Sequence, residues 1–120
     1  MAMTIIDYKV KSASINLSPD IAPNRNYKIN PKIGCSIKRG ENKLLVNFTV
    51  EVARGADPVP FEFRLVADGI IGFEDSDDFS TVTTKAAEAI YPFVRSSVAS
   101  LTQIANVPPY ILPFVNLADL

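Results

Sequence analysis

The hydrophobic residues of this chain alternate with a period of two over the first two-thirds of its 120 residues and then switch to helical spacing. A period of two is typical of strands that bury one face, and a spacing of three and four is typical of a helix that lies on a sheet. The length suits a single domain with one hydrophobic core, spanning residues 1–120. The switch therefore predicts an α+β fold with its strands first and its helix last.

Four segments of the chain carry the alternating pattern. Three of them follow one another with turns of about four residues between them, which predicts an antiparallel meander. With the first segment they make a four-stranded antiparallel sheet. The phase of the first segment changes between Val10 and Ala13, so we expect a bulge there. The expected strands are residues 6–17, 27–38, 46–52 and 61–73, with turns at 39–42 and 55–58.

The second of these segments has one apolar and one basic face. Tyr27, Ile29 and Ile33 share one parity, and three lysines lie on the other. Pro31 cannot donate a ladder hydrogen bond, which predicts an edge strand or an irregular one. A single-stranded nucleic-acid site would need aromatic side chains between the lysines, and this face has none. Since the net charge is also −1, we expect a solvated face and no nucleic-acid partner.

One long helix is expected after the acidic residues 74–78, because carboxylates suit the positive end of a helix dipole. Apolar residues from Ala87 to Ala105 form a stripe that can lie on the sheet. Pro92 falls inside this stripe and leaves two alternatives open: it begins the main helix, or it kinks a longer one. Residues 106–109 are expected to end the helix, and residues 116–120 to form a short C-terminal helix.

Another face of the same helix carries mostly small side chains, at Ser97, Ser100 and Ile104. Small side chains let a partner helix approach closely. One helix covers only one face of the sheet, and the chain is too small for a further layer, so other apolar surface is expected to meet another copy. We therefore expect a homo-oligomer, a dimer or a dimer of dimers, that uses these three residues and a strand edge.

The residues that commonly perform catalysis are scarce. The chain has no histidine, which removes the commonest general base and metal ligand. The lone Cys35 lies on the inward parity of its strand and is interpreted as a small buried apolar residue. Residues 74–78 lack the ligand spacing of a calcium loop, and no glycine-rich loop follows a strand. We expect no catalytic residue, no metal and no cofactor, so binding is the expected activity.

The sequence also bears on where the protein resides. It has no uninterrupted apolar run of about 18 residues, so no membrane insertion is expected. Residues 1–11 lack a basic start, an apolar run and a cleavage site, so they do not resemble a signal peptide. A single cysteine cannot form an internal disulfide. These observations predict the cytoplasm.

The C-terminal residues 90–120 are unusually apolar for the end of a soluble chain. Three prolines keep the stretch 107–114 extended and exclude a helix or a central strand. Two alternatives stay open, and they are compatible if the stretch moves. Its side chains fold back and close the core, or they form one wall of an apolar site for an extended polypeptide. The candidate residues are Val107, Pro108, Tyr110, Leu112 and Phe114.

The same part of the chain resembles the SecB family of export chaperones. The residues from Ile90 to Arg95 are similar to the family's Leu-Phe-Pro-Tyr-Ala-Arg, and Val107-Pro108 is similar to its Phe-Pro. Residues 113–117 resemble its Ala-Pro-Val-Asn-Phe, with the proline displaced by one. Residues 66–71 resemble the end of the family's fourth strand, and a weaker match at 14–17 resembles the end of its first strand.

The resemblance implies a SecB-like fold of four antiparallel strands, a long helix and a short C-terminal helix. It also implies dimers of dimers that hold unfolded polypeptide clients in apolar grooves without ATP. The groove lies between the sheet and the loop that joins the two helices, which is residues 106–113 here. Tyr27, Ile29 and Ile33 would face that loop, a choice that rests on parity.

Family members often pass preproteins to the motor protein SecA, by a zinc-binding tail and acidic sheet residues. This sequence stops at Leu120 without cysteine or histidine nearby, and its second strand is lysine-rich. Both departures count against SecA as a partner. The expected function is therefore a SecB-like holdase, with protein export as one role. The alternative is a dedicated partner-binding protein, such as the SecB-like chaperones of antitoxins in toxin–antitoxin systems, and a small-ligand carrier or enzyme is a third class.

Overall fold

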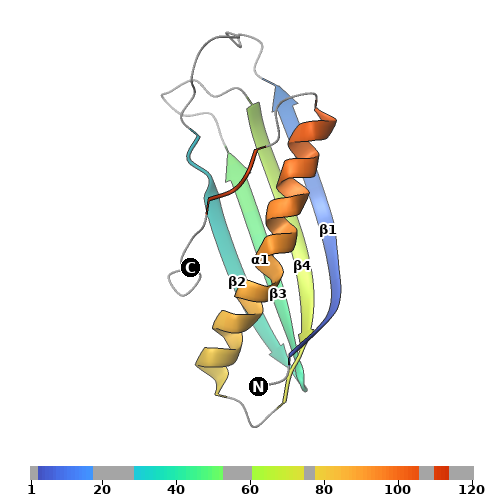
Figure 1. The fold of residues 1–120 in the computed structure, drawn as a ribbon, viewed down its shortest axis with the longest axis vertical. Coiled ribbons are helices and arrows are strands. Elements are labelled where there is room, and N and C mark those ends of the chain that lie inside the picture. The colour runs from blue at the N-terminus through green and yellow to red at the C-terminus, as the bar shows by residue number, and fades with distance from the viewer. Residues whose placement is uncertain (1–2, 18–28, 53–60, 75–77, 106–109, 114–120) are drawn as a thin grey trace.

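A four-stranded antiparallel sheet lies against one long helix in the computed structural model of the chain (Figure 1). The structure describes residues 3–17, 29–52, 61–74, 78–105 and 110–113. The expected turn at 55–58, the helix end at 106–109 and the short C-terminal helix at 116–120 lie outside the described residues. The predicted α+β class is confirmed. The elements are β1 (Thr4–Leu17), β2 (Lys32–Gly40), β3 (Lys43–Val52), β4 (Phe61–Gly72) and α1 (Phe79–Ile104).

The strands lie in the order β1-β4-β3-β2. All neighbours are antiparallel, so β2, β3 and β4 form the predicted meander, and β1 joins it along β4. β1 and β2 are therefore the two edges of the sheet. The register of β1 shifts between Val10 and Ser12, which confirms the predicted bulge. A second shift, between Ile5 and Asp7, was not predicted.

The second strand differs from its prediction at both ends. Ile29 and Pro31 precede the strand, which begins at Lys32 rather than at residue 27, because a proline has no amide hydrogen for the ladder. The strand also continues through Gly40, which pairs with Lys43. The turn is consequently shorter than the predicted 39–42. Its last residue is Asn42, with a φ of 55° that asparagine adopts more readily than most side chains.

The helix is a single element that passes through Pro92. The alternative in which Pro92 begins the main helix is therefore wrong. A proline inside a helix removes one backbone hydrogen bond. Here Ile90 and Val94 are fully buried on either side of it, so packing on the sheet fixes the helix across this position. Asp78 is the N-cap residue, and its carboxylate accepts hydrogen bonds from the hydroxyls of Ser80 at 2.8 Å and Thr81 at 3.1 Å.

The core lies between α1 and the inward faces of β3 and β4. Every second residue of these strands is buried, as the period of two predicts. The helix crosses the sheet diagonally (Figure 1). It passes close over Gly69, where an added Cβ would crowd the side chain of Ile90, so that side chain would have to shift. The fully buried residues of this core include Leu44, Val46, Phe48, Val50, Ala67, Ile71, Val82, Ala86, Ile90, Val94 and Val98.

Candidate functional site

The stretch Tyr110–Pro113, which we call the C-terminal segment, runs across the sheet between α1 and β2 (Figure 1). Its side chains alternate in exposure. Leu112 is completely buried and Tyr110 is half-buried, whereas Ile111 between them is 58% exposed. An extended chain that lies with one face on a protein surface shows this alternation. The segment therefore covers a part of the sheet that the diagonal helix does not reach.

The surface beneath the segment is aromatic. Phe61 and Phe63 of β4 lie with their ring centroids 5.8 Å apart. The ring of Tyr110 lies 6.0 Å from Phe61, edge-on, and 6.4 Å from Phe63. Burial raises the pKa of the Tyr110 hydroxyl above its usual value. We call Phe61, Phe63, Tyr110 and Leu112 the apolar corner.

Three side chains of α1 hold the C-terminal segment by hydrogen bonds to its backbone. The Tyr91 hydroxyl donates to the carbonyl of Pro113 at 2.8 Å, and Arg95 Nε donates to the carbonyl of Leu112 at 3.1 Å. The amide of Tyr110 donates to the Thr102 hydroxyl at 2.9 Å. Burial raises the pKa of Tyr91, against the opposing effect of Arg95, so its hydroxyl keeps the proton that it donates.

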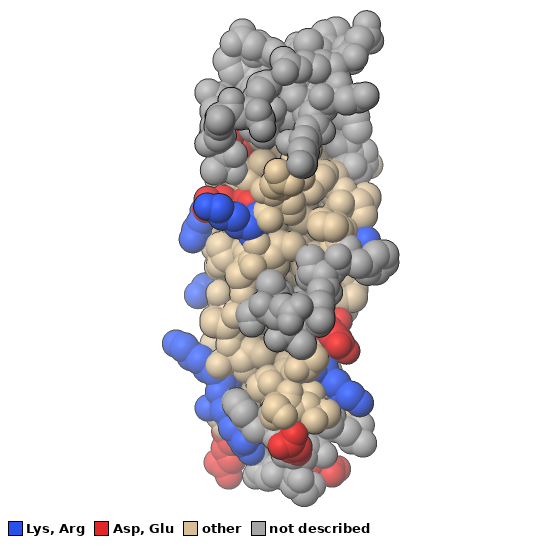
Figure 2. Space-filling model, turned by 90° about the vertical axis from the view of Figure 1, so that its left-hand side faces the viewer, with Lys and Arg blue, Asp and Glu red and all other residues tan. Residues whose placement is uncertain are grey.

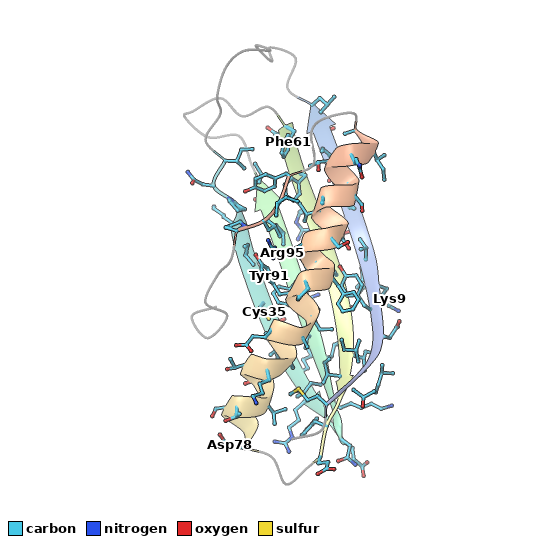
Figure 3. All side chains as sticks on the ribbon, viewed as in Figure 1. Lys9, Cys35, Phe61, Asp78, Tyr91 and Arg95 are labelled. Carbon is cyan, nitrogen blue, oxygen red and sulfur yellow. The ribbon has the colours of Figure 1, made fainter. Side chains whose placement is uncertain are left out.

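These three side chains lie on one side of α1, because residues four and eleven positions apart fall on the same side of a helix. Figure 3 shows Tyr91 and Arg95 on the β2 side of the helix and Phe61 at the start of β4. Thr102 is completely buried, and its hydroxyl donates to the helix carbonyls of Val98 and Ala99. The hydroxyl oxygen can therefore accept the amide hydrogen of Tyr110.

The predicted binding residues fall into two groups. Tyr110 and Leu112 lie in the apolar corner, and Ile29 and Ile33 are partly buried against the same core. Inward-facing Tyr110 and Leu112 fit the alternative in which the stretch folds back and closes the core. The other candidates, Tyr27, Val107, Pro108 and Phe114, lie outside the described residues. Five further members of this site were not predicted from the sequence: Phe61, Phe63, Tyr91, Arg95 and Thr102.

A second apolar surface lies along β1 on the same face of the sheet. Ile5, Val10 and Leu17 pair with inward-facing residues of β4 and so point to the helix side. With Phe93 of α1 they are 41% to 47% exposed, and Ile104 is 82% exposed. We call these five residues the apolar flank. No described part of the chain covers them to the extent that the C-terminal segment covers its corner.

Of the predicted interface residues, Ile104 belongs to this flank, and Ser97 and Ser100 lie on the same helix. Ser100 and Ile104 are exposed. Ser97 is half-buried, because its hydroxyl lies 2.8 Å from the hydroxyl of Tyr8 and donates to the carbonyl of Phe93 at 2.9 Å. The rings of Tyr8 and Phe93 lie 5.3 Å apart. Burial raises the pKa of Tyr8, and the hydrogen bond with Ser97 lowers it by a smaller amount.

Both edges of the sheet carry exposed lysines. The β2 edge faces the viewer in Figure 2, which shows Lys and Arg side chains beside a band without charged groups. Lys32 and Lys38 are exposed on the outward parity of β2, and Lys9 and Lys11 are exposed on β1. Charged side chains discourage an edge strand from pairing with another chain. The β1 edge therefore differs from the β2 edge in its exposed apolar flank and not in the presence of charge.

The described residues offer little chemistry for catalysis. Within them, no group of three or more His, Cys, Asp or Glu side chains is placed to hold a metal ion. Cys35 is half-buried against the core, and burial raises its thiol pKa to about 11. The thiol is therefore protonated at neutral pH and a poor nucleophile. In the same part of the chain, no helix is long and apolar enough to cross a membrane.

Comparisons with known proteins show which solved structures share this fold. No family model matches the sequence, and no curated protein matches it. Among solved structures, the SecB-like chaperone Rv1957 of Mycobacterium tuberculosis, in complex with a ChAD peptide from the Rv1956 HigA1 antitoxin, is similar with a TM-score of 0.74. The identity is 14% over 94% of this chain and 90% of the other. A protein of unknown function from Streptococcus agalactiae has a TM-score of 0.52 and 16% identity, over 95% of this chain and 100% of the other.

The chain therefore has the fold of a SecB-like protein. The resemblance read from the residues around Pro92 and Val107-Pro108 is confirmed at the level of the fold. The low identity explains why whole-sequence comparison finds no match, and it marks the chain as a divergent example of this fold.

Proposed function

We propose that the protein is an ATP-independent holdase that binds non-native polypeptide at the apolar corner. The observation that carries this proposal is the fold shared with a SecB-like chaperone over 94% of the chain. That chaperone is bound to a peptide from an antitoxin. The aromatic and aliphatic surface on this chain supplies the matching physical chemistry for a polypeptide client.

The energetics of such a site suit reversible binding. Ile29 and Ile33 offer apolar surface around the corner. Tyr110 and Leu112 face the sheet and become accessible only when the C-terminal segment leaves it. Burying about 300 Å² of apolar client surface contributes roughly 7 kcal/mol before the cost of ordering the client. One site therefore binds modestly, and several sites on an oligomer add avidity.

The apolar flank supports a homo-oligomer. β1 is an edge strand, so a second copy can extend the sheet there while Phe93 and Ile104 become buried between the copies. Ser100 borders the same surface, and Ser97 contributes through its contact with Tyr8. We propose a dimer or a dimer of dimers with this surface as an interface. Static light scattering at micromolar concentration tests it, and a monomeric mass would exclude it.

The holdase proposal is tested by mixing the wild-type chain with a chemically denatured client and recording light scattering after dilution. The proposal expects aggregation to be suppressed at stoichiometric amounts, with and without ATP. A protein of similar size and charge with no exposed apolar surface is the control. Unchanged aggregation at a several-fold excess of the chain would exclude a general holdase.

The alternative is a chaperone dedicated to one partner, such as an antitoxin. The antitoxin peptide bound by the structurally similar chaperone is the observation in its favour. A toxin–antitoxin pair encoded beside the gene would support this alternative, and binding of that antitoxin but not of denatured model clients would establish it. For either function we propose a cytoplasmic location, no cofactor and no requirement for SecA.

A further inference from the structure

We infer that the C-terminal segment occupies the client site as an internal ligand, and that a client takes its place. The site would bind an extended peptide with an aromatic side chain at one position and an aliphatic side chain two residues later. This inference rests on the proposed function and adds to it the class of peptide that binds. It also changes the role of Tyr110 and Leu112 from site wall to occupant.

The hydrogen bonds made by α1 to the segment explain how different peptides can bind. Tyr91 and Arg95 donate to backbone carbonyls, and Thr102 accepts from a backbone amide. Every peptide carries these groups at the same positions along its backbone, apart from an amide at proline. The helix thus holds the backbone of its occupant without regard to the side chains, as a binder of many clients requires.

The two inward-facing positions of the segment determine which client side chains fit the site. Tyr110 lies over Phe61 and Phe63, a surface that favours an aromatic ring. Leu112, two residues later, is completely buried and so favours an aliphatic side chain of similar size. Ile111 points outward, so the position between them accepts any residue. The predicted client pattern is therefore aromatic, any residue, aliphatic.

The segment follows α1 in the same chain, so a client must compete with a ligand that is always present. Short tethers give effective concentrations in the millimolar range. If the segment leaves the site for only a small fraction of the time, the apparent affinity for a client falls by that fraction. This competition would keep the aromatic surface covered until a client with the right pattern arrives.

The first experiment uses the isotope-labelled wild-type chain and a synthetic peptide with the sequence of residues 107–115. Amide hydrogen exchange at Tyr110 reports on its bond to Thr102. We expect saturating peptide to accelerate this exchange about ten-fold or more, because the segment is displaced. The control peptide carries serine at the positions of Tyr110 and Leu112. Unchanged or slower exchange in the presence of bound peptide would overturn the inference.

The second experiment measures binding of the same peptide, labelled with fluorescein, to variants of the segment. Tyr110→Ala weakens the internal ligand and leaves Phe61, Phe63 and Tyr91 in place, so we expect the peptide to bind about ten-fold tighter. Ile111→Ala alters an outward residue of the same segment and should bind as the wild type does. Weaker binding to Tyr110→Ala, with circular dichroism showing a folded chain, would make Tyr110 part of the wall and overturn the inference.

The two proposals fail in different ways. A peptide that binds while Tyr110 stays protected preserves the holdase and removes the internal ligand. Absence of both peptide binding and aggregation suppression, in the wild type and in Tyr110→Ala alike, removes the holdase itself and the inference with it.

Discussion

The apolar corner and the apolar flank lie on the same face of the sheet and adjoin where Leu17 pairs with Phe61, and they differ in what covers them. The corner is covered by the chain's own C-terminal segment, which buries Leu112 completely. The flank leaves Val10, Phe93 and Ile104 exposed. A surface covered by a segment of its own chain becomes exposed when that segment is displaced. An apolar surface that is always exposed is instead expected to be buried by a permanent partner. This difference supports the proposal that clients bind at the corner and that copies of the chain associate through the flank.

The largest expected effect contrasts two residues of the C-terminal segment. Leu112→Ala should lower the free energy of unfolding by about 2–5 kcal/mol, because it opens a cavity at a completely buried position. Ile111→Ala, at a position that is 58% exposed, should change it by less than about 1 kcal/mol. Urea titration followed by circular dichroism measures both. Equal costs would show that the segment does not pack on the corner as described.

The next effect concerns the flank. Val10→Lys places a charge on the β1 edge at a residue that is 41% exposed, so the chain should fold but its copies should separate. We expect the mass from light scattering to fall to that of a smaller assembly or a monomer. Lys9→Gln, which alters the opposite parity of the same strand, is the matched control. An unchanged mass for Val10→Lys would move the interface away from β1.

A smaller pair of effects compares two tyrosine hydroxyls. Tyr91→Phe removes the bond to Pro113 in the corner, and Tyr8→Phe removes the contact with Ser97 beside the flank. Each should cost about 1 kcal/mol of unfolding free energy. Only Tyr91→Phe should speed amide exchange in the C-terminal segment, because only that hydroxyl contacts it. Faster exchange at the segment in Tyr8→Phe would mean that corner and flank are coupled.

The last effect is a pH dependence from Cys35, which lies against the core on β2, at the edge of the sheet opposite β1. Burial raises its thiol pKa from 9.0 to about 11, so the folded chain holds this proton more tightly than the unfolded chain. Its contribution to stability is complete below pH 9 and is lost as the pH rises to about 11. Cys35→Ala should make the stability curve flatter over this window. An identical curve for the variant would show that the thiol is not buried in solution.

Much of the fold was predictable from the sequence because it rests on local patterns. The period of two in β3 and β4 predicts which residues are buried, and the change of phase after Val10 predicts the bulge. The start of β2 was misplaced because one proline outweighs an apolar pattern that continues through it. Pro92 was ambiguous because the sequence alone does not show how firmly the sheet holds the helix around it.

The site was less predictable, for a physical reason. Tyr110 and Leu112 could be singled out as candidates because an apolar stretch stiffened by proline stands out in a sequence. Tyr91, Arg95 and Thr102 were missed because their partners are backbone atoms, and contacts to a backbone leave no signature in the partner's side chains. A spacing of four and then seven among polar residues beside the apolar stripe is the one signal that could have indicated them.

The most direct test of the division between corner and flank is photo-crosslinking from one residue of each surface. A benzophenone side chain is placed at Ile33, beside the corner on β2, in one variant and at Phe93 in another, and each is irradiated with a denatured client present. The account predicts client adducts from position 33 and adducts between copies of the chain from position 93. Client adducts mainly from position 93, with position 33 joining copies of the chain, would contradict it.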